Sequence, residues 1–80
     1  SEKFEMTAPL GKLLQQITDP IKFKKGIDLI VAYREAIPQG FRVQTDPYFN
    51  FKILGELLKA KKQKGENELA AQVAAVLPKM

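Results

Sequence analysis

The stretch that decides the fold is TDPIKFKKGIDLIVAYREAIPQG, residues 18–40. Thr18-Asp19-Pro20 predicts a helix start, because a carboxylate can accept hydrogen bonds from free N–H groups and proline suits the first helical position. The segment ends at Pro38-Gln39-Gly40. Between these signals, apolar residues cover an arc of roughly 200° on a helical wheel: Phe23, Ile27, Leu29, Ile30, Val31, Tyr33 and Ile37. The pattern predicts a central, largely buried helix over residues 20–37.

Three further helices are predicted around it. A short first helix over 8–17 carries leucine and isoleucine at spacings of three and four: Leu10, Leu13, Leu14 and Ile17. Asp46-Pro47 repeats the Asp-Pro pattern of a capped helix start, so a third helix should run from Pro47 to about Lys64 and end at Gly65. Its expected apolar side contains Phe49, Phe51, Ile53, Leu54, Leu57, Leu58 and Ala60. A fourth, narrow helix over 67–77 ends before Pro78.

The expected fold is all-α, a compact four-helix domain with a short first helix, a central second helix and an antiparallel hairpin of helices three and four. The length of 80 residues suits one helical domain over 1–80. Residues 1–7 are expected to form an extended N-terminal segment. Residues 38–45 should form an extended crossover loop between the second and third helices.

The composition excludes several kinds of chemistry. The chain contains no His, no Cys and no Trp, so imidazole catalysis, thiolate catalysis, disulfides and zinc sites built on His and Cys are ruled out. Its carboxylates form neither a metal pair nor an acid/base dyad, and there is no glycine-rich phosphate loop. We therefore expect a protein that is not an enzyme and has no cofactor and no metal.

The charge balance favours anionic partners without demanding them. Thirteen Lys and Arg residues against nine Asp and Glu residues give a formal net charge of +4. No apolar run is long enough to span a membrane, and no signal peptide is evident. A small, basic, soluble domain is expected; the compartment is left open, with a cytoplasm-like setting as the default.

The densest basic run is the end of the third helix, and it supports two interpretations. Its members are Lys59, Lys61, Lys62 and Lys64. Cations in a last helical turn complement the negative end of the helix dipole, which is a purely structural role. Alternatively, Lys61 and Lys64 lie on the angular side that is apolar earlier in the helix, so the helix could extend beyond its core as a basic tip that binds phosphates.

Tyr48 is the second candidate, because a helical wheel places it on the polar edge close to Lys52 and Lys59. An exposed aromatic beside lysines can anchor a protein contact or stack on a base. The structural alternative is a ring laid on the edge of the core with its hydroxyl in water. Glu56 is spaced to pair with either lysine.

Two other features concern packing. Gly26 and Gly55 lie inside predicted helices, where glycine costs about 1 kcal/mol. Gly26 is therefore expected to allow close approach of another backbone, and if the second and third helices cross near Gly26 and Gly55, their axes should be unusually close there. Arg34 falls inside the apolar arc of the second helix. It can extend its head to the helix edge, or it can reach a carboxylate on another segment or a partner.

The sequence favours a non-catalytic helical protein-interaction module, such as an adaptor, a regulator or a structural subunit. The expected partner-binding residues are Tyr48, Lys52, Lys59, Lys61, Lys62 and Lys64. The alternative is a small basic nucleic-acid-binding protein that uses the basic tip of the third helix. A third class, a small-ligand or lipid carrier, requires a hollow core, and the oligomeric state is left open.

Overall fold

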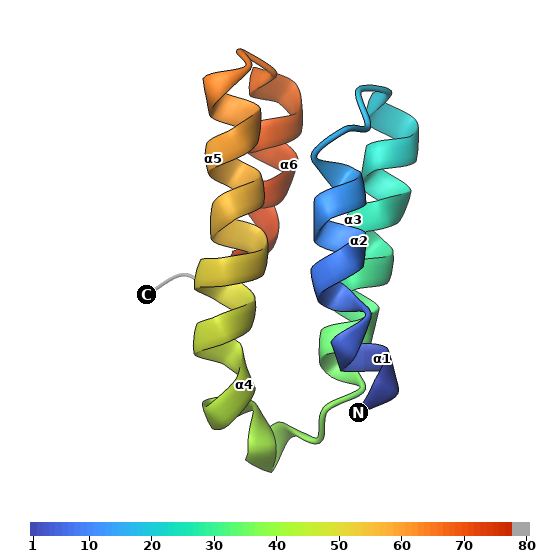
Figure 1. Ribbon diagram of the computed structural model, residues 1–80, viewed down its shortest axis with the longest axis vertical. Coiled ribbons are helices and arrows are strands. Elements are labelled where there is room, and N and C mark those ends of the chain that lie inside the picture. The colour runs from blue at the N-terminus through green and yellow to red at the C-terminus, as the bar shows by residue number, and fades with distance from the viewer. Residues whose placement is uncertain (78–80) are drawn as a thin grey trace.

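The computed structural model describes residues 1–77, and the secondary structure in this part of the chain is helical without strands (Figure 1). The four-helix, all-α architecture predicted from the sequence is confirmed. Its elements are α1 (Glu2–Glu5), α2 (Thr7–Leu14), α3 (Pro20–Glu35), the short 3-10 turn η1 (Gln39–Phe41), α4 (Arg42–Tyr48), the π-helical segment η2 (Phe49–Leu54), α5 (Gly55–Gln63) and α6 (Asn67–Val76).

The helices form two hairpins that lie side by side (Figure 1). One hairpin pairs α2 with α3, and the other pairs α5 with α6. The hairpins meet where α3 packs on α6 and where α2 packs on η2 and α5. Because α4, η2 and α5 follow one another without a break, they act as one long helix that extends past the end of α6 (Figure 1).

The core lies between the two hairpins. Its buried members are Leu14, Phe23, Ile27, Ile30, Phe49, Ile53, Leu54, Leu57, Leu69 and Val73. Three of them come from α3, at positions 23, 27 and 30, which places α3 against both of its neighbours. The buried arc of α3 is narrower than the sequence indicates, because Leu29 is exposed and Val31 and Tyr33 are only partly buried.

The helix ends confirm part of the predicted capping. The Asp19 carboxylate accepts a hydrogen bond from the backbone N–H of Lys22 at 2.8 Å, so it caps α3 as expected. Gly65 has a φ of 72° and follows α5, in the left-handed conformation that glycine adopts at low cost. Lys24 pairs with Asp28 one turn along α3.

The N-terminal segment is helical where an extended chain was expected. Residues Glu2–Glu5 form α1, whose first turn is capped by the Ser1 hydroxyl. The Phe4 ring packs against Phe49, with 6.3 Å between the ring centroids. Thr7 is buried and donates from its hydroxyl to the Phe4 carbonyl at 2.7 Å. Partial burial of Phe4 against Phe49 therefore gives this short segment a tertiary reason to fold.

The crossover is shorter than predicted, because the third long helix begins at Arg42 and Pro47 lies inside it. The Arg42 guanidinium donates to the carbonyls of Ile37 at 2.9 Å and Glu35 at 3.1 Å, which satisfies the end of α3 and turns the chain. Residues 42–45 are therefore helical, and the expected extended loop over 38–45 is wrong for them. Asp46 consequently lies within α4 and is not an N-cap, as the sequence suggested.

Gly26 and Gly55 do not mark a crossing of α3 with the third long helix. A Cβ atom added at Gly26 would lie 2.2 Å from Cδ2 of Leu14, so Gly26 allows close packing of α3 on α2 and not on the third long helix. At Gly55 the nearest atom to an added Cβ would be the Asn50 carbonyl oxygen of its own helix, at 3.1 Å. The close approach that Gly26 permits is therefore between α2 and α3.

Candidate functional site

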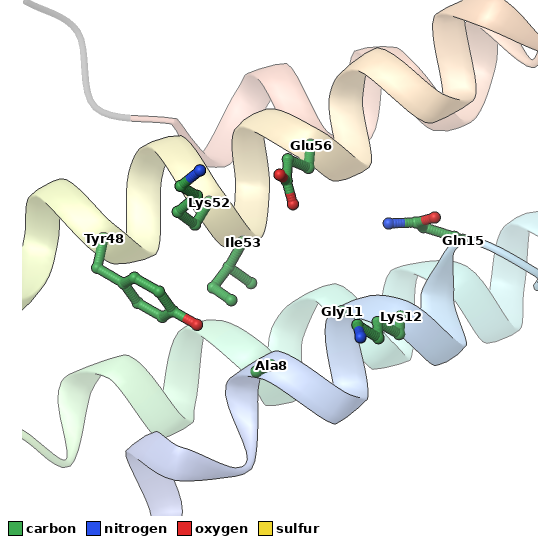
Figure 2. A pocket seen from close by; sticks show the side chains of 8 residues that line it. All are labelled: Ala8, Gly11, Lys12, Gln15, Tyr48, Lys52, Ile53 and Glu56. Carbon is green, nitrogen blue, oxygen red and sulfur yellow. The ribbon is translucent and has the colours of Figure 1, made fainter.

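Tyr48 and Lys52 line a shallow cleft between α2 and the η2–α5 helix (Figure 2). The cleft measures about 140 Å³, and its other lining residues are Ala8, Gly11, Lys12, Gln15, Ile53 and Glu56. The Tyr48 side chain is 48% exposed, and its ring reaches across toward α2 with the hydroxyl directed to Ala8 (Figure 2). Tyr48 therefore covers one end of the cleft and keeps a face in solvent.

The charges in this cleft are mixed. Lys12 and Lys52 contribute two ammonium groups, while the Glu56 carboxylate points into the space between the helices (Figure 2). The expected pairing of Glu56 with Lys52 or Lys59 does not form: within residues 1–77 the ion pairs are Lys24–Asp28, Arg34–Asp46 and Lys61–Glu66. A carboxylate that lines the same cleft as two lysines disfavours a simple anion pocket, because it repels the ligand that the lysines attract.

Lys61 does not project from the bundle, and the expectation that it belongs to an exposed tip is wrong. Its side chain is 0% exposed, and Nζ donates to the carbonyls of Gln15 at 3.0 Å and Ile17 at 2.8 Å. The Glu66 carboxylate lies 3.3 Å away, and Nζ is 5.2 Å from the centroid of the Phe23 ring. The core extends to this turn of the helix. The Lys61 ammonium group can be buried there because backbone carbonyls and a carboxylate surround it.

Lys64 is exposed but donates to the same Gln15 carbonyl at 2.8 Å. Lys61 of α5 and Lys64, which directly follows α5, therefore satisfy the carbonyls that follow α2, where the helix dipole is negative. The basic run therefore stabilises the end of a neighbouring helix, α2, whereas the sequence suggested that it stabilises the end of its own helix. Lys59 and Lys62 remain exposed on α5. The six candidate residues are thus divided among three places, and only Tyr48 and Lys52 share a cleft.

A second surface was missed by the sequence analysis. The α4 groove is an apolar depression of about 450 Å³ lined by Val43, Asp46, Pro47, Asn50, Phe51, Gly55 and Leu77. Val43 is 76% exposed and Phe51 is 67% exposed. Phe51 was expected in the core, but residues two apart on a helix point to nearly opposite sides, so it faces outward while Phe49 is buried. Because residues 38–45 were predicted to form a loop, the four-residue helical spacing of Val43, Pro47 and Phe51 was not apparent from the sequence.

Asp46 is the carboxylate that lines this groove, and Arg34 holds it. The Arg34 Nε donates to Oδ1 at 3.0 Å and Nη2 donates to Oδ2 at 2.7 Å, a two-bond pair that ties α3 to α4. Of the alternatives predicted for Arg34, the structure shows the contact with a carboxylate on another segment. Because these hydrogen bonds favour the charged form, the pKa of Asp46 lies below its usual value and that of Arg34 lies above its own.

Comparison with protein-family models, curated proteins and solved structures finds no match for this chain. Among residues 1–77, no helix is long and apolar enough to cross a membrane. The same residues contain no cluster of three or more acidic, His or Cys side chains that could hold a metal ion.

Proposed function

We propose that this chain is a non-catalytic helical protein-interaction module that binds its partner along the α4–η2 helix. The α4 groove carries this proposal, because Val43 and Phe51 are large apolar side chains that remain mostly exposed on a small domain. Exposed apolar side chains gathered in one depression are typical of binding sites. Tyr48 supports the proposal, since it is a half-exposed aromatic on the same helix and aromatic residues often anchor interfaces.

The alternative of nucleic-acid binding loses its main support. It required a continuous basic tip, but Lys61 is buried and Lys64 donates to a carbonyl of the same chain. Lys59 and Lys62 remain as exposed cations on α5, and two lysines supply few of the phosphate contacts that nucleic-acid binding needs. An apolar groove next to an aromatic residue also suits a protein better than a sugar-phosphate backbone.

A photo-crosslinking experiment tests the proposal. A photoreactive phenylalanine analogue replaces Tyr48 in one sample and Phe51 in another, and Ile21, an exposed apolar residue on α3, serves as the matched control site. We expect protein adducts from positions 48 and 51 but not from position 21. Tyr48→Ala should weaken binding to the captured partner by more than about 1 kcal/mol without changing stability.

A gel-shift assay against mixed DNA and RNA provides the opposing result. The proposal would be wrong if neither position yields a protein adduct while the chain shifts nucleic acid. In that case, replacing Lys59 and Lys62 by Gln should lower the slope of log affinity against log salt by up to about one unit per lost phosphate contact.

A further inference from the structure

A row of residues runs along one side of the long helix. Its members recur every fourth residue: Val43, Pro47, Phe51, Gly55 and Lys59. In an α-helix each such step drifts by roughly 40°, but the wider π-helical segment in the middle rotates less per residue and offsets part of that drift. The first four members line the α4 groove, and Lys59 lies one turn beyond it. The row therefore joins an apolar end to a basic end.

The apolar end is concave. The second wall of the α4 groove comes from Leu77, directly after α6, and Ala74 lies one turn earlier on the same side of that helix. A depression of about 450 Å³ falls within the range of pockets that hold side chains or small ligands. A ridge of apolar side chains can enter such a groove, whereas a flat lipid surface cannot follow it. The shape favours a partner helix with large residues three or four positions apart.

The basic end is free of internal ion pairs. Within the described residues, Lys59 and Lys62 are exposed and neither takes part in an ion pair. The carboxylate at the other end, Asp46, already has both of its oxygens bound to Arg34. The row therefore presents two exposed lysines that form no ion pair with residues 1–77 beside apolar surface, and the whole chain has a formal net charge of +4. Its complement is a partner that is negative near Lys59 and apolar near Phe51.

We infer that this row binds an acidic amphipathic helix of a partner protein. The apolar side chains of that helix lie in the α4 groove against Val43 and Phe51, and its carboxylates face Lys59 and Lys62. Phe51 and Lys59 are eight residues apart, which corresponds to about 12 Å along a helix. The partner should therefore carry Asp or Glu roughly two turns from the side chain that contacts Phe51. This inference rests on the proposed function and adds the class of partner.

The test is a selection from a displayed library of helical peptides against the full chain. The peptides carry fixed leucines at spacings of three and four, with all other positions free. We expect enrichment of Asp or Glu about two turns from one end of the leucine ridge. Phe51→Ala should reduce the affinity of the enriched peptides at least about tenfold. The matched control, Ile21→Ala, removes an equally exposed apolar side chain on α3 and should leave affinity within about twofold.

Charge reversal separates this site from a non-specific attraction. When Lys59 and Lys62 are both replaced by Glu, the selection should instead enrich Lys or Arg at the same distance from the leucine ridge. Lys25→Glu, an exposed change on α3, should leave the original preference for acidic residues unchanged. Helical circular dichroism and the denaturation midpoint identify any variant that fails to fold. Val43→Ala replaces Phe51→Ala if the latter is unstable, since Val43 is the more exposed of the two.

Several results would overturn the inference. One is that the selection enriches peptides without acidic residues, or that it enriches the same acidic peptides when Lys59 and Lys62 are replaced by Glu. A second is binding to anionic lipid vesicles that Phe51→Ala abolishes, since the row would then contact a membrane surface. A third is a concentration-dependent dimer that Phe51→Ala dissolves, since the occupant would then be a second copy. A protein adduct at position 51 without acidic preference leaves the interaction module intact and refutes only the partner class; no adduct at 48 or 51 refutes the module itself.

Discussion

The Lys61 ammonium group donates a hydrogen bond to the carbonyl of Ile17 at 2.8 Å, although 44 residues separate the two in the chain. This contact ties the end of the α2–α3 hairpin to the α5–α6 hairpin. The charge is fully buried, and the Gln15 carbonyl and the Glu66 carboxylate complete its surroundings. A lysine that a sequence pattern assigns to solvent thus joins the two halves of the domain.

Lys61→Met should lower the free energy of unfolding by about 2 to 4 kcal/mol, because it leaves a buried carbonyl and a carboxylate without their cation. Chemical denaturation measures the loss. Lys62→Met, at the neighbouring exposed position, is the matched control and should stay within about 0.5 kcal/mol of the parent chain. Equal effects of the two substitutions would show that the buried contact contributes nothing specific.

Acid should weaken the link between α3 and α4. The pKa of Asp46 in the folded chain lies below its ordinary value of 3.8, mainly because Arg34 donates hydrogen bonds to the carboxylate. The stabilisation from this pair is therefore fully present above that ordinary value and is lost as the pH falls toward the folded-state pKa. Asp46→Asn should reduce the fall in stability measured between about pH 5 and pH 2.

Arg34→Gln removes the other partner and provides the control for this pH dependence. It should reduce the acid-dependent loss in the same way, and combining it with Asp46→Asn should cause little further change, because both substitutions remove one interaction. Additive effects of the two substitutions would contradict the assignment of the pH dependence to this pair.

Gly26→Ala should destabilise the domain by about 1 to 3 kcal/mol, even though alanine favours helices. The added Cβ would lie 2.2 Å from Leu14 Cδ2, and Leu14 is fully buried, so the core must rearrange. In a Leu14→Val background, which removes the clashing carbon, the same change should cost much less. A thermodynamic double-mutant cycle measures this coupling, and a value of zero would refute the close contact.

Asp19→Ala should cost about 1 kcal/mol, because the Asp19 carboxylate accepts the Lys22 N–H bond at the start of α3. Asp28→Ala is the matched control: it removes another exposed carboxylate, whose partner is the Lys24 ammonium group, and surface pairs of this spacing contribute at most about 0.5 kcal/mol. If denaturation does not distinguish the two variants, the cap is energetically unimportant.

Several features of the fold were predictable from the sequence because they depend on neighbours in the chain. Asp19 caps α3 through a residue three positions away, and Gly65 ends α5 through its own backbone conformation. Helical periodicity likewise places Phe23, Ile27 and Ile30 on one buried face. Prediction from neighbouring residues failed at Asp46-Pro47. The sequence indicates that the Asp46 carboxylate caps a helix start, but in the structure this carboxylate accepts two hydrogen bonds from the distant Arg34.

The candidate surfaces likewise combine features that follow from neighbours in the chain with features that depend on distant contacts. The sequence by itself determined that the chain is helical, where α3 begins, and that Tyr48 and Lys52 share an edge, since each follows from spacing along one helix. Only the tertiary structure decided that Lys61 is buried, that Phe51 lines a groove with Leu77, and that Lys59 and Lys62 stay exposed. The physical reason is that burial of a charge or exposure of an aromatic ring depends on which groups of other helices lie opposite it. Those contacts join residues far apart in the chain, and no local pattern specifies them.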